Sequence, residues 1–348
     1  MTQSDERALA GLLLRLLLDE ARPDATVVDW GVLLPLARRN GTLLRVADRL
    51  AERGPAPPPL VADAIATERR RVRDAFGLVR NVSRVCTTHA IAFLFPKAFQ
   101  HYPDVGEDLD LLVLSRAADV DALLARELSA TAAPRDLAGR IAGTVTFRVR
   151  DVRTLLDVQH GRIGTVGEHR AYAVALVRNH HRVIIEGTEC AVPWPEDQLV
   201  LQGVQRIYGR RSLRLCDVVY TIASPRDDPL DWPYILSMAR RIGVLPGLAC
   251  YLSYVEQIHR ELFDGPLVPA AVRRRVPLEG WGRIEFTRGA YRFPAVRVNG
   301  KLYLKQLVAG LWAANWDRAA RLCLLPLVGA AVTVGHLTTP SAPSVESA

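Results

Sequence analysis

Residues 95–114, FPKAFQHYPDVGEDLDLLVL, join a loop rich in turn residues to a short apolar run. The final letters, LLVL, are apolar at every position, which is typical of a strand that is buried on both faces. Asp108 and Asp110 begin this strand. Because side chains at i and i+2 of a strand share a face, the two carboxylates point the same way, about 7 Å apart along the chain.

Two carboxylates this close repel each other unless cations lie between them. Hard divalent ions such as Mg²⁺ bind through one or two carboxylates together with substrate phosphates. A third carboxylate on a neighbouring strand would complete a site for two ions roughly 4 Å apart.

Further apolar runs rich in β-branched and aromatic residues surround this strand. They predict a mixed sheet of four to six strands. The runs are AIAFLF (90–95), DLDLLVL (108–114), TVTFRV (144–149), TLLDVQ (154–159), HRVIIEG (181–187) and TECAVPW (188–194), with a helix expected over 118–130.

Helical periodicity dominates on both sides of the sheet. We therefore predict an α+β fold, a mixed β-sheet flanked by N-terminal and C-terminal helical regions. Two β-hairpins are expected near the end, RIEFTRGAYRF (283–293) and VRVNGKLYL (296–304), the second on the strong Asn-Gly turn signal, followed by a helix from about Lys305. The expected units are 1–86 (helical), 87–195 (sheet), 196–265 (helical), 266–338 (hairpins and helix, or a separate partner-binding module) and 339–348 (a disordered tail).

One pattern occurs twice, as DWGVLLPLARRNG (29–41) and DWPYILSMARRIG (231–243). Each copy predicts a helix that is capped by an aspartate and ended by a glycine. We interpret the two copies as packing elements, including their tryptophans, Trp30 and Trp232.

The chain has 348 residues, of which 49% are hydrophobic, and a net charge of +8. These values fit a globular protein of two or three packed units. Lys97, Lys301 and Lys305 are the only lysines, and the arginines are scattered. Scattered charge favours plain solvation, although a basic balance also suits a polyanionic partner such as NTP or RNA.

Five separated cysteines, an odd number, predict a reduced cytoplasmic chain with neither a disulfide framework nor a zinc site. The opening MTQSDER is acidic and predicts no secretory signal. The apolar stretch 322–334 is shorter than the ~20 residues that span a membrane, so a buried helix is expected there. His160, His180 and His181 are expected to be structural, because adjacent strand residues such as the last two face opposite ways.

From about Asp29 to Leu262 the chain resembles the bacterial nucleotidyltransferase family of the DNA polymerase beta superfamily. The resemblance rests on the order and spacing of several motifs. These are Asp29-Trp30, an apolar strand leading to Lys97, Tyr102-Pro103-Asp104, Asp108-Leu109-Asp110 followed by Leu-Leu-Val, the helix that begins Pro-Glu-Asp (195–197), and Leu215-Cys216-Asp217.

The resemblance implies transfer of an NMP from an NTP to a hydroxyl or phosphate acceptor. It assigns catalysis and metal binding, by Mg²⁺ or Mn²⁺, to Asp108, Asp110 and a third carboxylate on a later strand. TLLDVQ resembles that strand, which implies Asp157, with Asp151 as the rival. Asp157 lies among leucines, where a lone charge is costly, so its alternative role is an ion pair with an arginine. The resemblance also places Lys97 near the NTP phosphates, whereas the alternative is a surface lysine on a turn. The acceptor is a small molecule, an RNA or a protein, and no membrane is involved.

The chain departs from the family pattern around Lys97. Ala98 stands where a glycine is expected, and Pro96 removes one amide donor. The arginine that often precedes the aspartates is missing, and no Gly-Ser or Gly-Gly turn is present to approach a triphosphate. These changes favour the alternative function, a binding or scaffold protein that has kept the fold and lost turnover.

Overall fold

The computed structural model describes residues 3–18, 29–52, 56–227 and 229–326. Its centre is a five-stranded sheet in the order β1-β2-β5-β4-β3. The strands are β1 (Phe93–Leu94), β2 (Asp108–Val113), β3 (Ala130–Ala132), β4 (Thr144–Val149) and β5 (Leu155–His160). Strands β2 and β5 are parallel and the other neighbours antiparallel, so the predicted mixed sheet is confirmed.

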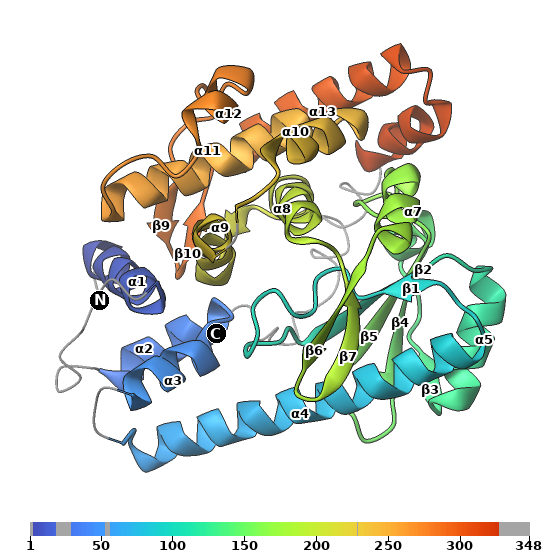
Figure 1. Cartoon of the computed structure of the whole chain (residues 1–348), viewed down its shortest axis with the longest axis horizontal. Helices are drawn as coiled ribbons and strands as arrows, with labels where there is room; N and C mark the ends of the chain where they lie inside the picture. Colours follow the sequence, from blue (N-terminus) through green and yellow to red (C-terminus); the bar gives the residue numbers. More distant parts are fainter. Residues whose placement is uncertain (1–2, 19–28, 53–55, 228, 327–348) are drawn as a thin grey trace.

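The N-terminal helices are α1 (Gln3–Leu17), α2 (Trp30–Arg39), α3 (Leu43–Ala51) and α4 (Pro59–Thr88). Figure 1 shows α4 running along one side of the strands. The helices between the strands are α5 (Ala117–Glu127), α6 (Leu137–Ala142) and α7 (Arg170–Arg178), and they are followed by the hairpin β6 (His181–Ile185) and β7 (Thr188–Val192). This hairpin joins the edge of the sheet through a hydrogen bond from Phe95 N to Ala191 O of 2.9 Å.

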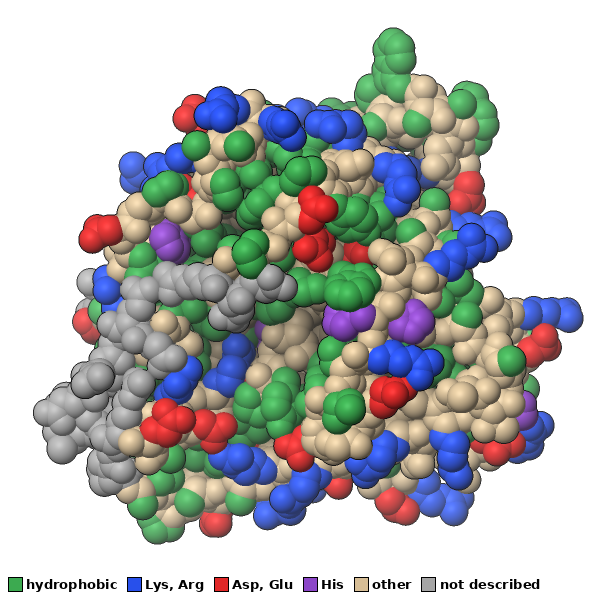
Figure 2. All heavy atoms as spheres, in the orientation of Figure 1, with side chains coloured by type: hydrophobic (Ala, Val, Ile, Leu, Met, Phe, Trp, Pro, Cys, Tyr) green, Lys and Arg blue, Asp and Glu red, His purple; other side chains and the backbone are tan. Residues whose placement is uncertain are grey.

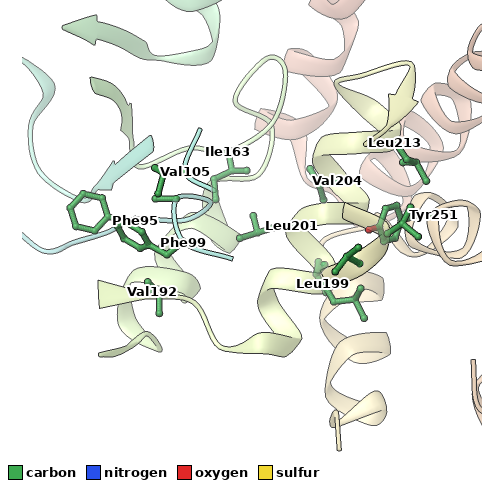
Figure 3. Packing of buried hydrophobic residues seen from close by; sticks show 14 of the residues in the cluster. Phe95, Phe99, Val105, Ile163, Val192, Leu199, Leu201, Val204, Leu213 and Tyr251 are labelled. Carbon is green, nitrogen blue, oxygen red and sulfur yellow. The ribbon is translucent and has the colours of Figure 1, made fainter. Parts of the chain in front are cut away.

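The later helices are α8 (Pro195–Gly203), which continues as a π-helical turn (Val204–Tyr208), α9 (Leu215–Asp227), α10 (Trp232–Arg241), α11 (Leu245–Leu262), α12 (Ala270–Arg275) and α13 (Ala295–Trp312). They lie mostly above the sheet in Figure 1. Figure 3 shows the apolar packing in this region, with Phe95 and Phe99 near the sheet and Leu199 and Tyr251 among the helices. The core is continuous between the two regions.

The repeated pattern forms α2 and α10, as expected. Asp29 accepts a hydrogen bond from Gly31 N, and Asp231 accepts one from Tyr234 N, both at 2.9 Å. Gly41 and Gly243 follow these helices with φ of 60° and 67°, a backbone conformation that glycine adopts without steric cost.

The first C-terminal hairpin is confirmed as β9 (Glu285–Thr287) and β10 (Ala290–Arg292). Strand β10 also pairs with β8 (Ser212–Leu213), so the hairpin shares a sheet with the preceding region.

The second predicted hairpin is wrong. Residues 295–312 form helix α13, and Asn299-Gly300 lies inside it. Val298, Leu302 and Gln306 are buried at a spacing of four, so one face of the helix enters the core. Burial of that face outweighs the turn preference of Asn-Gly and the helix penalty of one glycine, about 0.5–1 kcal/mol.

After a turn at 313–315, a further helix spans residues 316–326. The rest of the apolar stretch 322–334 and the expected tail lie outside the described residues. Across the part of the chain that the structure describes, no helix combines the length and the apolar content needed to cross a membrane. All five cysteines are free thiols, as predicted.

Candidate nucleotidyl-transfer site

The three predicted aspartates lie on one polar face of the central sheet. Asp108 and Asp110 begin β2, and Asp157 lies directly opposite Asp110 on the parallel strand β5. Side chains in register on neighbouring strands are close neighbours. Leu109 and Leu111 point to the other face and are fully buried. The two-residue period of the strand therefore directs both carboxylates to the face opposite Leu109 and Leu111.

Asp110 is held by two donors. Its Oδ1 accepts a hydrogen bond of 2.7 Å from the Gln159 amide and lies 3.1 Å from the Lys97 ammonium. Burial raises the pKa of Asp110, the charge of Lys97 lowers it, and the charge of Asp108 raises it further, so that the pKa is raised overall. Asp110 is thus a buried carboxylate whose negative charge depends on a neighbouring cation.

Asp157 has a hydroxyl partner. Its Oδ1 accepts a hydrogen bond of 2.6 Å from Thr146, which lies opposite on β4. Burial raises the pKa of Asp157, Thr146 lowers it, and Asp108 and Asp110 raise it further, with a raised pKa as the result. Within the described ranges, Asp157 has this hydroxyl as its partner and no arginine within ion-pair distance.

Asp151, the rival for the third carboxylate, lies away from this face. It is exposed in the turn between β4 and β5, with a φ of 62°. The strand register therefore brings Asp157, and not Asp151, next to Asp110.

The three aspartates do not converge tightly. Across the described ranges, only His101, Cys216 and Asp217 form a group of three or more candidate metal ligands with atoms within 4.8 Å of one another. Asp110 turns towards Lys97 and Gln159, and Asp157 turns towards Thr146, so their carboxylates are engaged separately.

The loop that carries Lys97 is fixed to the rest of the molecule at both ends. Phe99 stacks on Phe76 of α4, with ring centroids 5.4 Å apart. Asp104 accepts hydrogen bonds from Leu44 N at 2.7 Å and from the Arg45 side chain at 3.0 Å. The aspartate of the Tyr-Pro-Asp motif is therefore structural, because it satisfies free amides at the start of α3.

The histidines have structural partners, as expected. His160 pairs with Asp121 of α5 at 2.9 Å, and His181 stacks on Trp194 with centroids 4.3 Å apart. His180 Nδ1 lies 2.8 Å from Val177 O. A second Asp-x-Asp pair, Asp119 and Asp121, lies in helix α5, within the helix expected over 118–130.

Two contributors to the site are absent from the sequence prediction, Gln159 and Thr146. Gln159 could have been found, since it lies two residues after Asp157 and therefore shares its face. Thr146 could not, because its position opposite Asp157 depends on the register of β4, which the sequence leaves open.

The donor set suits a hard divalent ion. Carboxylate oxygens of Asp108, Asp110 and Asp157 are ligands that Mg²⁺ and Mn²⁺ prefer. The ammonium of Lys97 beside Asp110 shows that this carboxylate already takes a cation as its neighbour. Gln159 donates to Oδ1 of Asp110, and Thr146 donates to Oδ1 of Asp157. The Oδ2 atom of each carboxylate is therefore left for another ligand.

Comparison with known proteins identifies a family. Residues 26–260 match the family model described as uncharacterised nucleotidyltransferase. Comparison with curated proteins gave no match. The matched range includes the whole polar face, the loop that carries Lys97, and helices α8 to α10. The chain therefore belongs to this uncharacterised nucleotidyltransferase family.

Proposed function

We propose that this chain is a metal-dependent enzyme that transfers an NMP from an NTP to a hydroxyl or phosphate group, with pyrophosphate as the leaving group. We also propose that it belongs to the polymerase beta-like superfamily. The observation that carries the proposal is the pairing of Asp110 with Asp157 across parallel strands, with Asp108 on the same face. Family membership supports nucleotidyl transfer in general terms.

In this proposal Asp108, Asp110 and Asp157 hold Mg²⁺ or Mn²⁺. The bound ions would activate the attacking oxygen and stabilise the leaving pyrophosphate. The protein's own task is positioning and electrostatics. Gln159 and Thr146 orient two of the carboxylates from behind, as outer partners of metal ligands commonly do.

Lys97 has two roles in the proposal. In the structure its ammonium balances the charge of Asp110 at 3.1 Å. With metal and NTP bound, Asp110 would no longer need Lys97 as its counter-charge, and the ammonium would be available for phosphate oxygens. A lysine suits this exchange because it is a compact charge on a flexible stem.

The acceptor would be a small molecule, an RNA or a protein. Figure 2 shows the side of the molecule that is also seen in Figure 1. On that side, Lys and Arg side chains are distributed among Asp and Glu side chains. A dispersed distribution lacks the clustered basic footprint of most nucleic-acid-binding surfaces. It therefore favours a small-molecule or protein acceptor over a long RNA.

A non-catalytic binding protein is the second candidate. The observation that favours it is the engagement of Asp110 by Lys97 and Gln159 and of Asp157 by Thr146, which balances the site without a bound ion. Ala98 also fits this function, because its buried methyl group occupies the place expected for a flexible glycine.

The deciding experiment measures transfer of label from each α-³²P NTP to components of a cell extract, with Mg²⁺ or Mn²⁺. We expect Asp110→Asn to reduce transfer by at least about a hundredfold, the scale of losing electrostatic stabilisation at a reacting centre. The matched control is Asp119→Asn, which removes an exposed aspartate of the other Asp-x-Asp pair and should retain activity. Equal activity in both variants would place catalysis elsewhere. Metal-dependent NTP binding without transfer would favour the binding protein.

A further inference from the structure

A second cluster of ligand-type side chains lies outside the aspartate face. It joins His101, in the loop after Lys97, to Cys216 and Asp217 near the start of α9. Cys216 and Asp217 are fully buried and His101 is 8% exposed. The proposed transfer reaction uses none of these three residues, although the loop and the Leu-Cys-Asp motif both belong to the family resemblance.

The ligand atoms of the cluster lie within 4.8 Å of one another, and two of the three distances match those of a zinc site. His101 Nε2 lies 3.4 Å from Asp217 Oδ1, and Cys216 Sγ lies 3.8 Å from the same oxygen. Zinc bonds of about 2.0–2.3 Å at tetrahedral angles place ligand atoms roughly 3.3–3.8 Å apart. One ion can therefore contact all three groups with only small movements.

The ligand types also match. Thiolate, imidazole and carboxylate together favour zinc over Mg²⁺, which prefers oxygen ligands alone. Arg206 Nε lies 2.9 Å from Asp217 Oδ2, and Arg214 N donates to the same oxygen at 2.8 Å. These donors stabilise the ionised carboxylate and leave Oδ1 directed towards His101 and Cys216, as outer partners of metal ligands do.

Among the described residues, Gln100 Oε1 is a buried polar atom beside the cluster that has no hydrogen-bond partner. The amide nitrogen of Gln100 lies 3.2 Å from His101 Nε2. Buried polar groups are rarely left without partners. Rotation of the Gln100 amide would direct its carbonyl oxygen at the cluster, where it could supply the fourth ligand of a tetrahedral site.

From this geometry we infer that His101, Cys216 and Asp217 bind a zinc ion in a structural site. The ion links the loop that carries Lys97 to α9, which lie far apart in the sequence. It is separate from the proposed Mg²⁺ site, and it does not depend on catalytic activity. Because structural zinc contributes directly to folding, its loss should loosen this loop first.

The test uses the full chain, purified under reducing conditions, with zinc measured by inductively coupled plasma mass spectrometry. Replacement of zinc by Co²⁺ gives a second readout, since a thiolate ligand produces a near-ultraviolet charge-transfer band and carboxylates do not. Cys216→Ser tests the ligand. Cys190→Ser is the matched control, because Cys190 is also buried and hydrogen-bonds to Thr188 O, a contact that serine can keep.

We expect about one zinc per chain, a thiolate band with Co²⁺, and a more than tenfold loss of zinc affinity in Cys216→Ser but not in Cys190→Ser. A chelator should lower the melting temperature of the wild-type chain and leave that of Cys216→Ser unchanged. Absence of the band in the wild-type chain would overturn the inference, and so would a band that persists in Cys216→Ser. The wild-type spectrum decides the question even if the variant does not fold.

Discussion

At the scale of single residues, the charge of Asp110 is the feature on which the site depends. The carboxylate is buried, and its cationic neighbour in the structure is Lys97. Removing one partner of a buried ion pair leaves an uncompensated charge, which costs far more than the pair itself contributes. Stability and ligand binding are therefore linked at this one contact.

Lys97→Met should lower the free energy of unfolding by about 1.5–3 kcal/mol in the presence of EDTA, the scale of one charged hydrogen bond. Added Mg²⁺ should recover more stability in the variant than in the wild-type chain, because the ion replaces the missing charge. NTP affinity should fall about ten- to a hundredfold. Urea unfolding with and without Mg²⁺, and calorimetry with a non-hydrolysable NTP, measure these effects.

The control for Lys97→Met is Lys305→Met, since Lys305 is exposed on α13 and belongs to neither site. An equal response to Mg²⁺ in the wild-type chain and in Lys97→Met would show that no ion reaches Asp110.

Thr146 offers a second residue-scale prediction. Thr146→Val keeps the shape of the side chain and removes the hydroxyl that donates to Asp157. The pKa of Asp157, already raised by burial, should rise further, and Mn²⁺ affinity should fall about 10–100-fold. Thr146→Ser keeps the hydroxyl and should therefore retain the wild-type pKa of Asp157 and the wild-type Mn²⁺ affinity. Paramagnetic resonance titration with Mn²⁺ measures the affinity, and equal values for valine and serine would show that Asp157 is not a ligand.

At the scale of elements, α3 depends on a residue outside its own sequence. Thr42 precedes the helix without a side-chain capping bond, and Asp104 supplies the acceptor from the distant loop. Asp104 is 6% exposed and also pairs with Arg45. The same contact thus caps a helix and fixes the loop that carries Lys97.

Asp104→Ala should lower the free energy of unfolding by about 2–3 kcal/mol. This is more than the loss of an ordinary N-cap, about 1 kcal/mol, because the change also removes the carboxylate partner of Arg45. Asp29→Ala provides the comparison, since Asp29 caps α2 at an exposed site. Urea unfolding of both variants measures the difference. An equal loss of unfolding free energy in Asp104→Ala and Asp29→Ala would show that the ion pair between Asp104 and Arg45 adds no stability.

At the scale of the whole molecule, Asn40 connects three distant segments. Its amide donates to Leu36 O at 2.9 Å and Gly289 O at 2.8 Å, and its oxygen accepts from Leu215 N at 2.9 Å. Asn40 is fully buried. The N-terminal helices, α9 and the β9–β10 hairpin therefore share one hydrogen-bonded junction.

Asn40→Ala should lower the free energy of unfolding by about 2–4 kcal/mol, because three hydrogen bonds are lost in a buried site. Asn40→Asp keeps the acceptor for Leu215 N and separates the effect of the two donor bonds. Urea unfolding and protease sensitivity near residue 289 measure the result. If Asn40→Ala loosens the β9–β10 hairpin alone, the stability of the rest of the chain does not depend on this junction. The C-terminal part would then be an independently stable unit.

Local patterns in the sequence determined much of the fold. The apolar run after Asp110 and the runs at 144–149 and 154–159 gave strands where they were expected, because alternation and burial act over a few residues. The capped helices at Asp29 and Asp231 also followed from local chemistry. The placement of Asp108 and Asp110 on one face needed nothing more than the two-residue period of a strand.

Tertiary structure decided the rest. Asn299-Gly300 became part of a helix, because burial of one face of α13 outweighs a local turn preference. Strand register brought Asp157 and Thr146 together, and the packing of α9 on the Lys97 loop brought His101 to Cys216. Such contacts join residues far apart in the sequence, and their free energy exists only once the chain has closed around them, so no local pattern can encode them.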